Sequence, residues 1–172
     1  MYKKIEKFIP LIAAALGVIA IIMFFLPAIT IKVGDEVVNY NGWQAIFGFT
    51  ETKDIPVVGE KKFEYLAFSF MNLLTLILLA AGIVLCVLSF LGKGNKFFAF
   101  IAIACFIVAA VFFFLTVAFT TAGAVYTLDG NLAQEKVKEA WKLGAGPIIG
   151  GILSILAGLV VSVPVVAKLL KK

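Results

Sequence analysis

The stretch that decides the fold is residues 8–33, which reads FIPLIAAALGVIAIIMFFLPAITIKV. Its uncharged run is long enough for a helix to cross the hydrocarbon core of a bilayer, which takes about 20 apolar residues. Pro27 cannot continue such a helix, because it lacks the backbone N–H that a helix interior needs. Beyond it, Ile29, Ile31 and Val33 alternate with polar residues, which is the period of a half-buried strand. The stretch therefore predicts a membrane helix that ends or kinks near Pro27 and leads into a strand.

The composition extends this conclusion to the whole chain. Of the 172 residues, 63% are hydrophobic and 15% are charged, and the mean hydropathy is +1.11. Soluble domains average about 45–50% apolar and about 25% charged residues, so a soluble domain of this composition could not cover its own surface. Four apolar stretches lack Asp, Glu and Lys and are long enough to span a bilayer. We expect one all-α membrane domain, 1–172, a four-transmembrane-helix bundle with spans at about 8–30, 66–91, 97–125 and 143–167.

The distribution of lysine predicts the orientation. The N-terminus, the link between the second and third spans, and the C-terminus together carry eight Lys and one acidic residue, a net charge of +7. The outer loops at about 31–65 and 126–142 carry seven Lys and nine acidic residues, a net charge of −2. Because cytoplasmic loops are enriched in basic residues, we expect a multi-pass plasma-membrane protein with both termini in the cytoplasm. The lysines are spread between apolar spans rather than gathered in one patch, so they do not indicate nucleic acid as a partner.

The first outer loop has the pattern of a small β-sheet. Residues 29–33 and 37–40 are rich in β-branched side chains and flank a Gly-Asp-Glu turn, which predicts a hairpin. A lone hairpin is marginally stable in water, so we expect it to find a third strand or to lie on the bilayer. Residues 55–58 are the candidate third strand, and Pro56 would confine it to an edge. The expected fold is thus a helical bundle with a small extracellular β-sheet formed by the first outer loop.

Aromatic residues in the two outer loops form a candidate interaction surface. The first loop contributes Trp43, Phe47 and Phe49. In the second loop, apolar residues follow helical spacing over residues 133–144, which predicts a short amphipathic helix with Trp141 at the membrane interface. Two interpretations are open: a docking surface for a partner, or anchors at the headgroup level, where amphipathic rings are enriched.

The fourth span carries the strongest periodic pattern, a small residue at every fourth position. The residues that share this spacing are Gly146, Gly150, Ser154, Gly158 and Ser162. Helices in lipid associate through close packing, which small side chains permit. We therefore predict a helix-packing face, either a seam between two copies of the chain or a contact of the fourth span with the first or third.

Residues that catalysis usually needs are missing. The chain has no His and no Arg, which removes the commonest general base and the bidentate clamp for anions. No ionisable side chain lies within a span, although such residues mark ion and proton pathways. Asn72 is the only amide in a span; we expect it to bond a neighbouring helix, with a substrate contact as the alternative. We predict no enzyme activity, no catalytic residue, no cofactor and no metal site, and we interpret Cys86 and Cys105 as small apolar residues.

The organisation of the chain resembles that of the claudin and peripheral-myelin-protein superfamily of four-span membrane proteins. The matching features are a proline-ended first helix that continues as a strand, Leu26–Ile31, a glycine–tryptophan pair at Gly42 and Trp43, a long third span and a short second outer loop. The resemblance implies the four-span architecture with a sheet in the first outer loop. Claudins carry a longer tryptophan motif and a cysteine pair in that loop, and this loop has one tryptophan and no cysteine. The resemblance therefore implies the architecture of this chain and does not imply the function of any residue. The layout is also similar to small four-span proteins of low-GC bacteria, a source that the excess of Lys over Arg favours.

These features together predict a function in binding rather than catalysis. We expect a structural or accessory membrane protein, surrounded by the lipid bilayer, that presents its outer sheet to another copy of itself or to a larger membrane complex. The alternative is a small transporter or lipid-handling subunit with a cavity between its helices. The spans contain few polar side chains, which disfavours transport of a polar cargo but is compatible with a lipid or apolar cargo.

Overall fold

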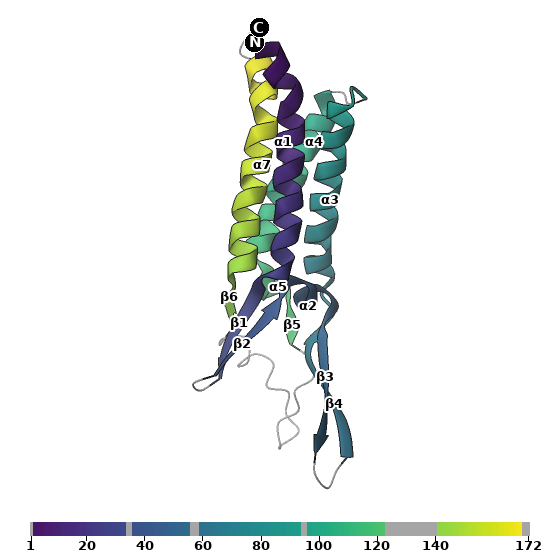
Figure 1. The fold of residues 1–172 in the computed structure, drawn as a ribbon, viewed down its shortest axis with the longest axis vertical. Coiled ribbons are helices and arrows are strands. Elements are labelled where there is room, and N and C mark those ends of the chain that lie inside the picture. Colours follow the sequence, from purple (N-terminus) through teal and green to yellow (C-terminus); the bar gives the residue numbers. More distant parts are fainter. Residues whose placement is uncertain (1, 34–35, 56–58, 94–95, 123–140, 170–172) are drawn as a thin grey trace.

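Among the residues that the structure describes, four long helices form the body of the protein. The computed structural model describes residues 2–33, 36–55, 59–93, 96–122 and 141–169. The long helices are α1 (Tyr2–Ile22), α3 (Phe70–Phe90), α4 (Lys96–Phe114) and α7 (Ala145–Leu169). They pack in the cyclic order α1, α3, α4, α7, and the start of α1 and the end of α7 lie at the same end of the bundle (Figure 1). By length and composition all four could cross a membrane, which confirms the predicted number of membrane-length helices.

The outer surface of the bundle is apolar. Large side chains that face outward include Val84, Leu159 and Val163, each of which is more than half exposed. The interior holds small residues together with buried rings such as Phe106 and Phe113. Soluble monomers rarely expose a continuous apolar patch larger than a few hundred Å². This distribution is the one expected of a bundle that contacts lipid.

The first helix is shorter than the sequence pattern predicts. α1 ends at Ile22, and one 3₁₀ turn, η1 (Met23–Phe25), follows it. Leu26 is then extended, with φ −82° and ψ 162°, and strand β1 (Pro27–Val33) begins within the predicted span. The cause is Pro27, whose ring disfavours the helical conformation at the residue before it. The predicted boundary of 8–30 is therefore wrong at its C-terminal end.

The predicted third span is interrupted. After α4, Leu115 has φ −93° and ψ 7°, a four-residue helix α5 (Thr116–Phe119) follows, and strand β5 (Thr121–Ala122) comes next. The Thr116 hydroxyl donates a 2.7 Å hydrogen bond back to a carbonyl of the preceding turn. Such a bond gives the backbone an alternative to the regular helical ladder. The prediction of one helix over 97–125 is wrong after α4, and its last three residues lie outside the described residues.

The second and fourth helices begin later than predicted because strands occupy the residues before them. Strand β4 (Gly59–Ala67) precedes α3, whose N-cap is Ser69. Strand β6 (Trp141–Leu143) precedes α7 and pairs with β1. The predicted amphipathic helix is therefore wrong for residues 141–143, and residues 133–140 lie outside the described residues. At these positions the backbone groups find their partners in a sheet, because β4 pairs with β3 and β5, and β6 pairs with β1.

In the described part of the chain, two three-stranded sheets lie at the end of the bundle away from the termini (Figure 1). The first has the order β2-β1-β6, and its antiparallel hairpin of β1 with β2 (Glu36–Asn41) is the predicted one. The second has the order β3-β4-β5 and is built on the hairpin of β3 (Phe49–Ile55) with β4. The prediction of a single sheet from the first loop is wrong: Ile55 ends β3, and residues 56–58 lie outside the described residues. Each hairpin gains a third strand from a distant segment: β6, just before α7, pairs with β1, and β5, just after α5, pairs with β4. A third strand is expected because a two-stranded hairpin is marginally stable alone.

Candidate functional site

The short helix α2 (Gly42–Phe47) positions two of the predicted aromatic residues between the two sheets. Its N-terminus is a capping box, in which the Asn41 side-chain oxygen accepts a bond from the Gln44 N–H and the Gln44 side-chain oxygen accepts one from the Asn41 N–H, both at 2.9 Å. This arrangement satisfies two helix-end donors at once. At the other end Gly48 has φ +86°, a conformation that favours glycine. The helix is thus fixed at both ends.

Trp43 and Phe47 lie in an aromatic cluster with Phe24 and Phe25, the last two residues of η1. The Trp43 and Phe47 rings are stacked, with centroids 6.2 Å apart and planes 5° apart. Trp43 also contacts the rings of Phe24 at 5.6 Å and Phe25 at 5.7 Å. Phe47 is 58% exposed and Phe25 is 66% exposed, so the cluster presents an aromatic surface. Phe24 and Phe25 are not among the aromatics that the sequence predicts for this surface, although both lie close to Pro27, near the end of the first span.

The other two predicted aromatics lie elsewhere. Phe49 packs against Tyr40 at 5.6 Å and Tyr65 at 6.0 Å between ring centroids, and it joins the two sheets. Trp141 is only 6% exposed and belongs to the buried cluster beneath the sheets. The expectation that all four aromatics share one exposed surface is therefore corrected. Strand pairing brings Trp141 opposite Ile31, and its side chain is buried there.

Asn72 lies in a buried hydrogen-bond network beside α2. Its side-chain nitrogen donates to the Ala45 carbonyl oxygen at 3.1 Å and to Thr120 Oγ1 at 2.8 Å, and the residue is 2% exposed. The Thr120 hydroxyl donates in turn to the Thr116 carbonyl oxygen at 2.8 Å. Asn72 therefore bonds neighbouring elements, as the sequence analysis expects, and it ties α2 and α5 to α3.

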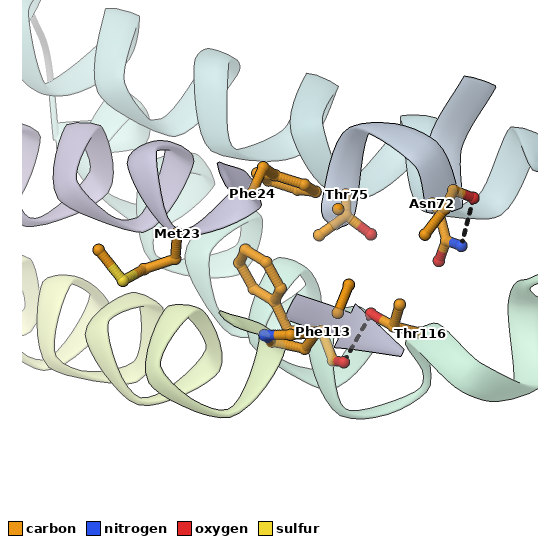
Figure 2. A pocket seen from close by; sticks show the side chains of 10 residues that line it. Met23, Phe24, Asn72, Thr75, Phe113 and Thr116 are labelled. Carbon is orange, nitrogen blue, oxygen red and sulfur yellow. Dashed lines mark hydrogen bonds between the residues drawn. The ribbon is translucent and has the colours of Figure 1, made fainter. Parts of the chain in front are cut away.

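A small cavity adjoins this network (Figure 2). Its lining includes Met23, Phe24, Asn72, Thr75, Phe113 and Thr116. Within the described part of the chain, the buried Oδ1 of Asn72 has no hydrogen-bond partner. The space measures about 10 Å³, and one water needs roughly 10–15 Å³ and two or more polar partners. The site can therefore hold a single hydrogen-bond donor such as water, and a solute of several heavy atoms does not fit.

The first two small residues of α7 lie against the rest of the same chain. A Cβ added at Gly146 would lie 2.7 Å from the Met23 carbonyl oxygen in η1. A Cβ added at Gly150 would lie 2.8 Å from the Phe113 ring of α4. A side chain at either position would force its neighbour to move, the backbone of η1 at Gly146 and a ring of α4 at Gly150.

The next residues of this face also contact the rest of the chain, but the contact becomes looser toward the C-terminal end of α7. Ser154 is fully buried, and its hydroxyl donates to a carbonyl of its own helix at 2.8 Å. At Gly158 the nearest atom to an added Cβ would be Ile107 of α4, at 3.5 Å. Ser162 is only partly buried and also bonds within its helix, at 2.7 Å. From Gly146 to Gly158 the face is thus an intramolecular contact, which is one of the two interpretations left open by the sequence.

The described residues contain no group of three or more Cys, Asp or Glu side chains that could hold a metal ion. Cys86 and Cys105 are both buried, at 1% and 9% exposure, and both are free thiols. Cys86 lines a second, mainly apolar cavity between the helices. Their surroundings agree with the interpretation of both residues as small apolar side chains.

Comparison with known proteins does not place the chain in a family. No protein-family model matches it, and no curated protein is significantly similar to it. The function proposed below therefore rests on the residues and geometry described above.

Proposed function

We propose that this protein is a non-catalytic integral membrane protein, a structural or accessory subunit that presents its sheets and aromatic cluster to a partner. The observation that carries the proposal is the contrast between the two parts of the molecule. The spans contain no Asp, Glu or Lys, and the polar side chains of the bundle interior bond mainly within the chain. The sheet end, by contrast, combines exposed aromatic rings with charged strands. Such a surface is suited to association with another protein.

The charge distribution supports an orientation in the plasma membrane. The start of α1, the link between α3 and α4, and the end of α7 lie at one end of the bundle (Figure 1). The segments at that end carry the net charge of +7, and the outer loops carry −2. Because basic residues are retained on the cytoplasmic side, we assign both termini to the cytoplasm and the sheets to the outer face.

A claudin-like arrangement is proposed at the level of architecture alone. β1 follows the proline-ended first helix directly, and the Gly42–Trp43 pair opens α2. A Cβ added at Gly42 would lie 2.5 Å from the Phe24 ring, so the glycine permits the contact on which the aromatic cluster is built. The first outer loop has no cysteine, and we therefore do not extend the likeness to the formation of paracellular barriers.

A small transporter or lipid-handling subunit is the second candidate. The cavity beside Asn72 has space for about one water, which disfavours a polar cargo of several atoms. A cavity of about 40 Å³ near Cys86 and Pro164 is lined mainly by apolar residues and is also small. The structural or accessory function is for this reason placed first.

The proposal is tested by extracting the protein at its native level in a mild detergent, measuring the mass of the intact particle and identifying every component. We expect a homo-oligomer or a stoichiometric protein partner. A lone monomer that holds a defined lipid or small molecule would refute the structural or accessory function and would favour the second candidate.

A matched pair of variants tests whether the aromatic cluster makes the contact. Phe47→Ser removes a ring that is 58% exposed, and Phe97→Ser, the control, removes one that is 65% exposed at the opposite end of the bundle. We expect the partner to be lost from the particle with Phe47→Ser alone. Retention of the partner in both variants, or its loss from both, would exclude the cluster as the specific contact.

A further inference from the structure

Three buried side-chain oxygens face the cavity beside Asn72. Asn72 and Thr75 belong to α3, and Thr116 is the first residue of α5. All three residues line the cavity, and their exposed fractions are 2%, 2% and 6%. Figure 2 shows the side-chain oxygens of these three residues directed toward the same space. The cavity therefore has a polar side, although its other described lining residues are apolar.

The two threonine hydroxyls have already used their hydrogens elsewhere. The Thr75 hydroxyl donates to the Met71 carbonyl oxygen at 3.3 Å. The Thr116 hydroxyl donates to the Phe113 carbonyl oxygen at 2.7 Å. A hydroxyl has one hydrogen and two lone pairs, so both threonine oxygens can still accept a bond, whereas the Asn72 Oδ1 can only accept. The three oxygens that face the cavity thus offer hydrogen-bond acceptors and no donor.

The size and charge of the cavity select its occupant. Within the described residues the buried Asn72 Oδ1 has no hydrogen-bond partner, and a buried acceptor without one is costly. The space of about 10 Å³ is at the lower limit of what one water needs. A metal cation could also bind to three oxygens, but the spans contain no Asp or Glu to balance its charge, and an unpaired buried charge costs far more than a neutral donor. The best occupant is therefore a neutral molecule of the size of water that donates hydrogen bonds.

We propose that this cavity is a binding site for one resident water molecule. The water donates one hydrogen to the Asn72 Oδ1 and the other to the oxygen of Thr75 or Thr116. Two polar partners are enough to hold a buried water, and the third acceptor makes the two threonines interchangeable. The Asn72 amide nitrogen already bonds the Ala45 carbonyl of α2. The water and the amide together connect α3 with α2 and with α5.

Magnetisation transfer from water to methyl groups tests the occupancy. The protein, with methyl-labelled alanine and in a mild detergent, is measured by nuclear magnetic resonance. Ala28 and Ala45 line the cavity and are each 1% exposed, while the control, Ala157, is fully buried in the bundle core. We expect nuclear Overhauser cross-peaks to water at Ala28 and Ala45 and none at Ala157. Cross-peaks at neither lining alanine, or equally strong ones at Ala157, would overturn the proposal.

Threonine variants test the partners of the water. Thr75→Val and Thr116→Val each replace one acceptor with a methyl group of similar shape. Each single variant leaves two acceptors, so the cross-peaks should remain. The double variant leaves the Asn72 Oδ1 alone, and its cross-peaks should fall to the level of Ala157. Cross-peaks that persist in the double variant, or that vanish in a single one, would refute the proposal.

Asn72→Leu separates a bound water from proton exchange. Hydroxyl protons exchange with bulk water and could pass magnetisation to the alanines without a resident water. This variant keeps both threonine hydroxyls and replaces the Oδ1 with a bulkier methyl group in a space of about 10 Å³. We expect the cross-peaks to be lost while the Ala157 signal keeps its position. Unchanged cross-peaks in the folded variant would identify exchange as their source and would overturn the proposal.

The salt in the buffer distinguishes water from a cation. The natural sequence is compared in sodium chloride and in N-methylglucamine chloride, whose large organic cation does not fit the cavity. We expect the same cross-peaks and the same Ala28 and Ala45 methyl shifts in both salts. Methyl shifts that follow the sodium concentration, without cross-peaks to water, would assign the site to a cation and overturn the neutral occupant.

Discussion

Three glycines on one face of α7 give a graded test of how the bundle packs. Gly146, Gly150 and Gly158 can each receive the same added methyl group, by substitution with Ala, but the space around it differs. At Gly146 the methyl would lie 2.7 Å from the Met23 carbonyl oxygen, which is part of the backbone. At Gly150 it would lie 2.8 Å from the Phe113 ring, and at Gly158 the nearest atom is 3.5 Å away.

The expected changes in the free energy of unfolding follow from these distances. Extra atoms in a well-packed core cost about 1–3 kcal/mol. Gly146→Ala should fall at the upper end of this range because the obstacle is backbone, and Gly150→Ala at the lower end because a ring can tilt. Gly158→Ala meets an ordinary contact and gains up to about 1 kcal/mol of helix propensity. The stability should therefore fall in the order Gly158→Ala, natural sequence, Gly150→Ala, Gly146→Ala.

Equilibrium unfolding in mixed micelles of a mild detergent and dodecyl sulfate, followed by circular dichroism, measures these differences. The particle mass in mild detergent should stay the same for all three variants, since the face is packed within one chain. A cost that is equal at the three positions, or largest at Gly158, would refute the packing argument. A change of oligomer size that accompanies the loss of stability would instead indicate the seam between two copies.

Three further perturbations probe the network, the topology and the aromatic cluster. Asn72→Leu removes two interhelical hydrogen bonds and should cost about 1–3 kcal/mol in the same unfolding assay. Thr75→Val removes a bond within its own helix, at 3.3 Å, and should cost less; an equal cost would contradict the importance of the network. In a cysteine-free background, Lys62→Cys should react with an impermeant thiol reagent in intact cells while Lys93→Cys is protected, and the reverse pattern would overturn the orientation. Gly42→Ala should lower the melting temperature because its Cβ would lie 2.9 Å from a backbone atom, and an unchanged melting temperature would contradict that contact.

The helical part of the fold is predictable because hydrophobic composition and length decide it. The helices α3 and α7 lie within a few residues of their predicted spans. The first and third spans are harder to delimit, since residues 28–30 and 121–122 are uncharged and, by composition alone, suit a membrane helix as well as a strand. Pro27 decides against the helix in the first span, and pairing of residues 121–122 with β4 does so in the third, where an apolar pattern alone does not predict a strand.

The sheets are only partly predictable because their third strands come from distant segments. The hairpin of β1 and β2 follows from alternation and a turn, both of which are local signals. The pairing of β1 with β6 joins residues such as Ile31 and Trp141, and no sequence pattern links them. For the same reason Trp141 is wrongly predicted as an exposed aromatic. Asn72 is predictable because a buried amide in a span needs partners, whereas the identity of those partners depends on α2 and α5.

The outer end of the molecule is joined to the bundle by directional bonds as well as by packing. The Ser69 N–H donates to the Ile46 carbonyl of α2 at 2.8 Å, and its hydroxyl donates to the Phe119 carbonyl at 2.7 Å. The Gly144 N–H donates to the Ala28 carbonyl of β1 at 2.8 Å. In a low-dielectric surrounding such bonds are costly to break, because the freed groups have no water to replace their partners. These bonds therefore couple α2 and strand β1 to α3 and α7, and the proposed structural or accessory function would depend on this coupling.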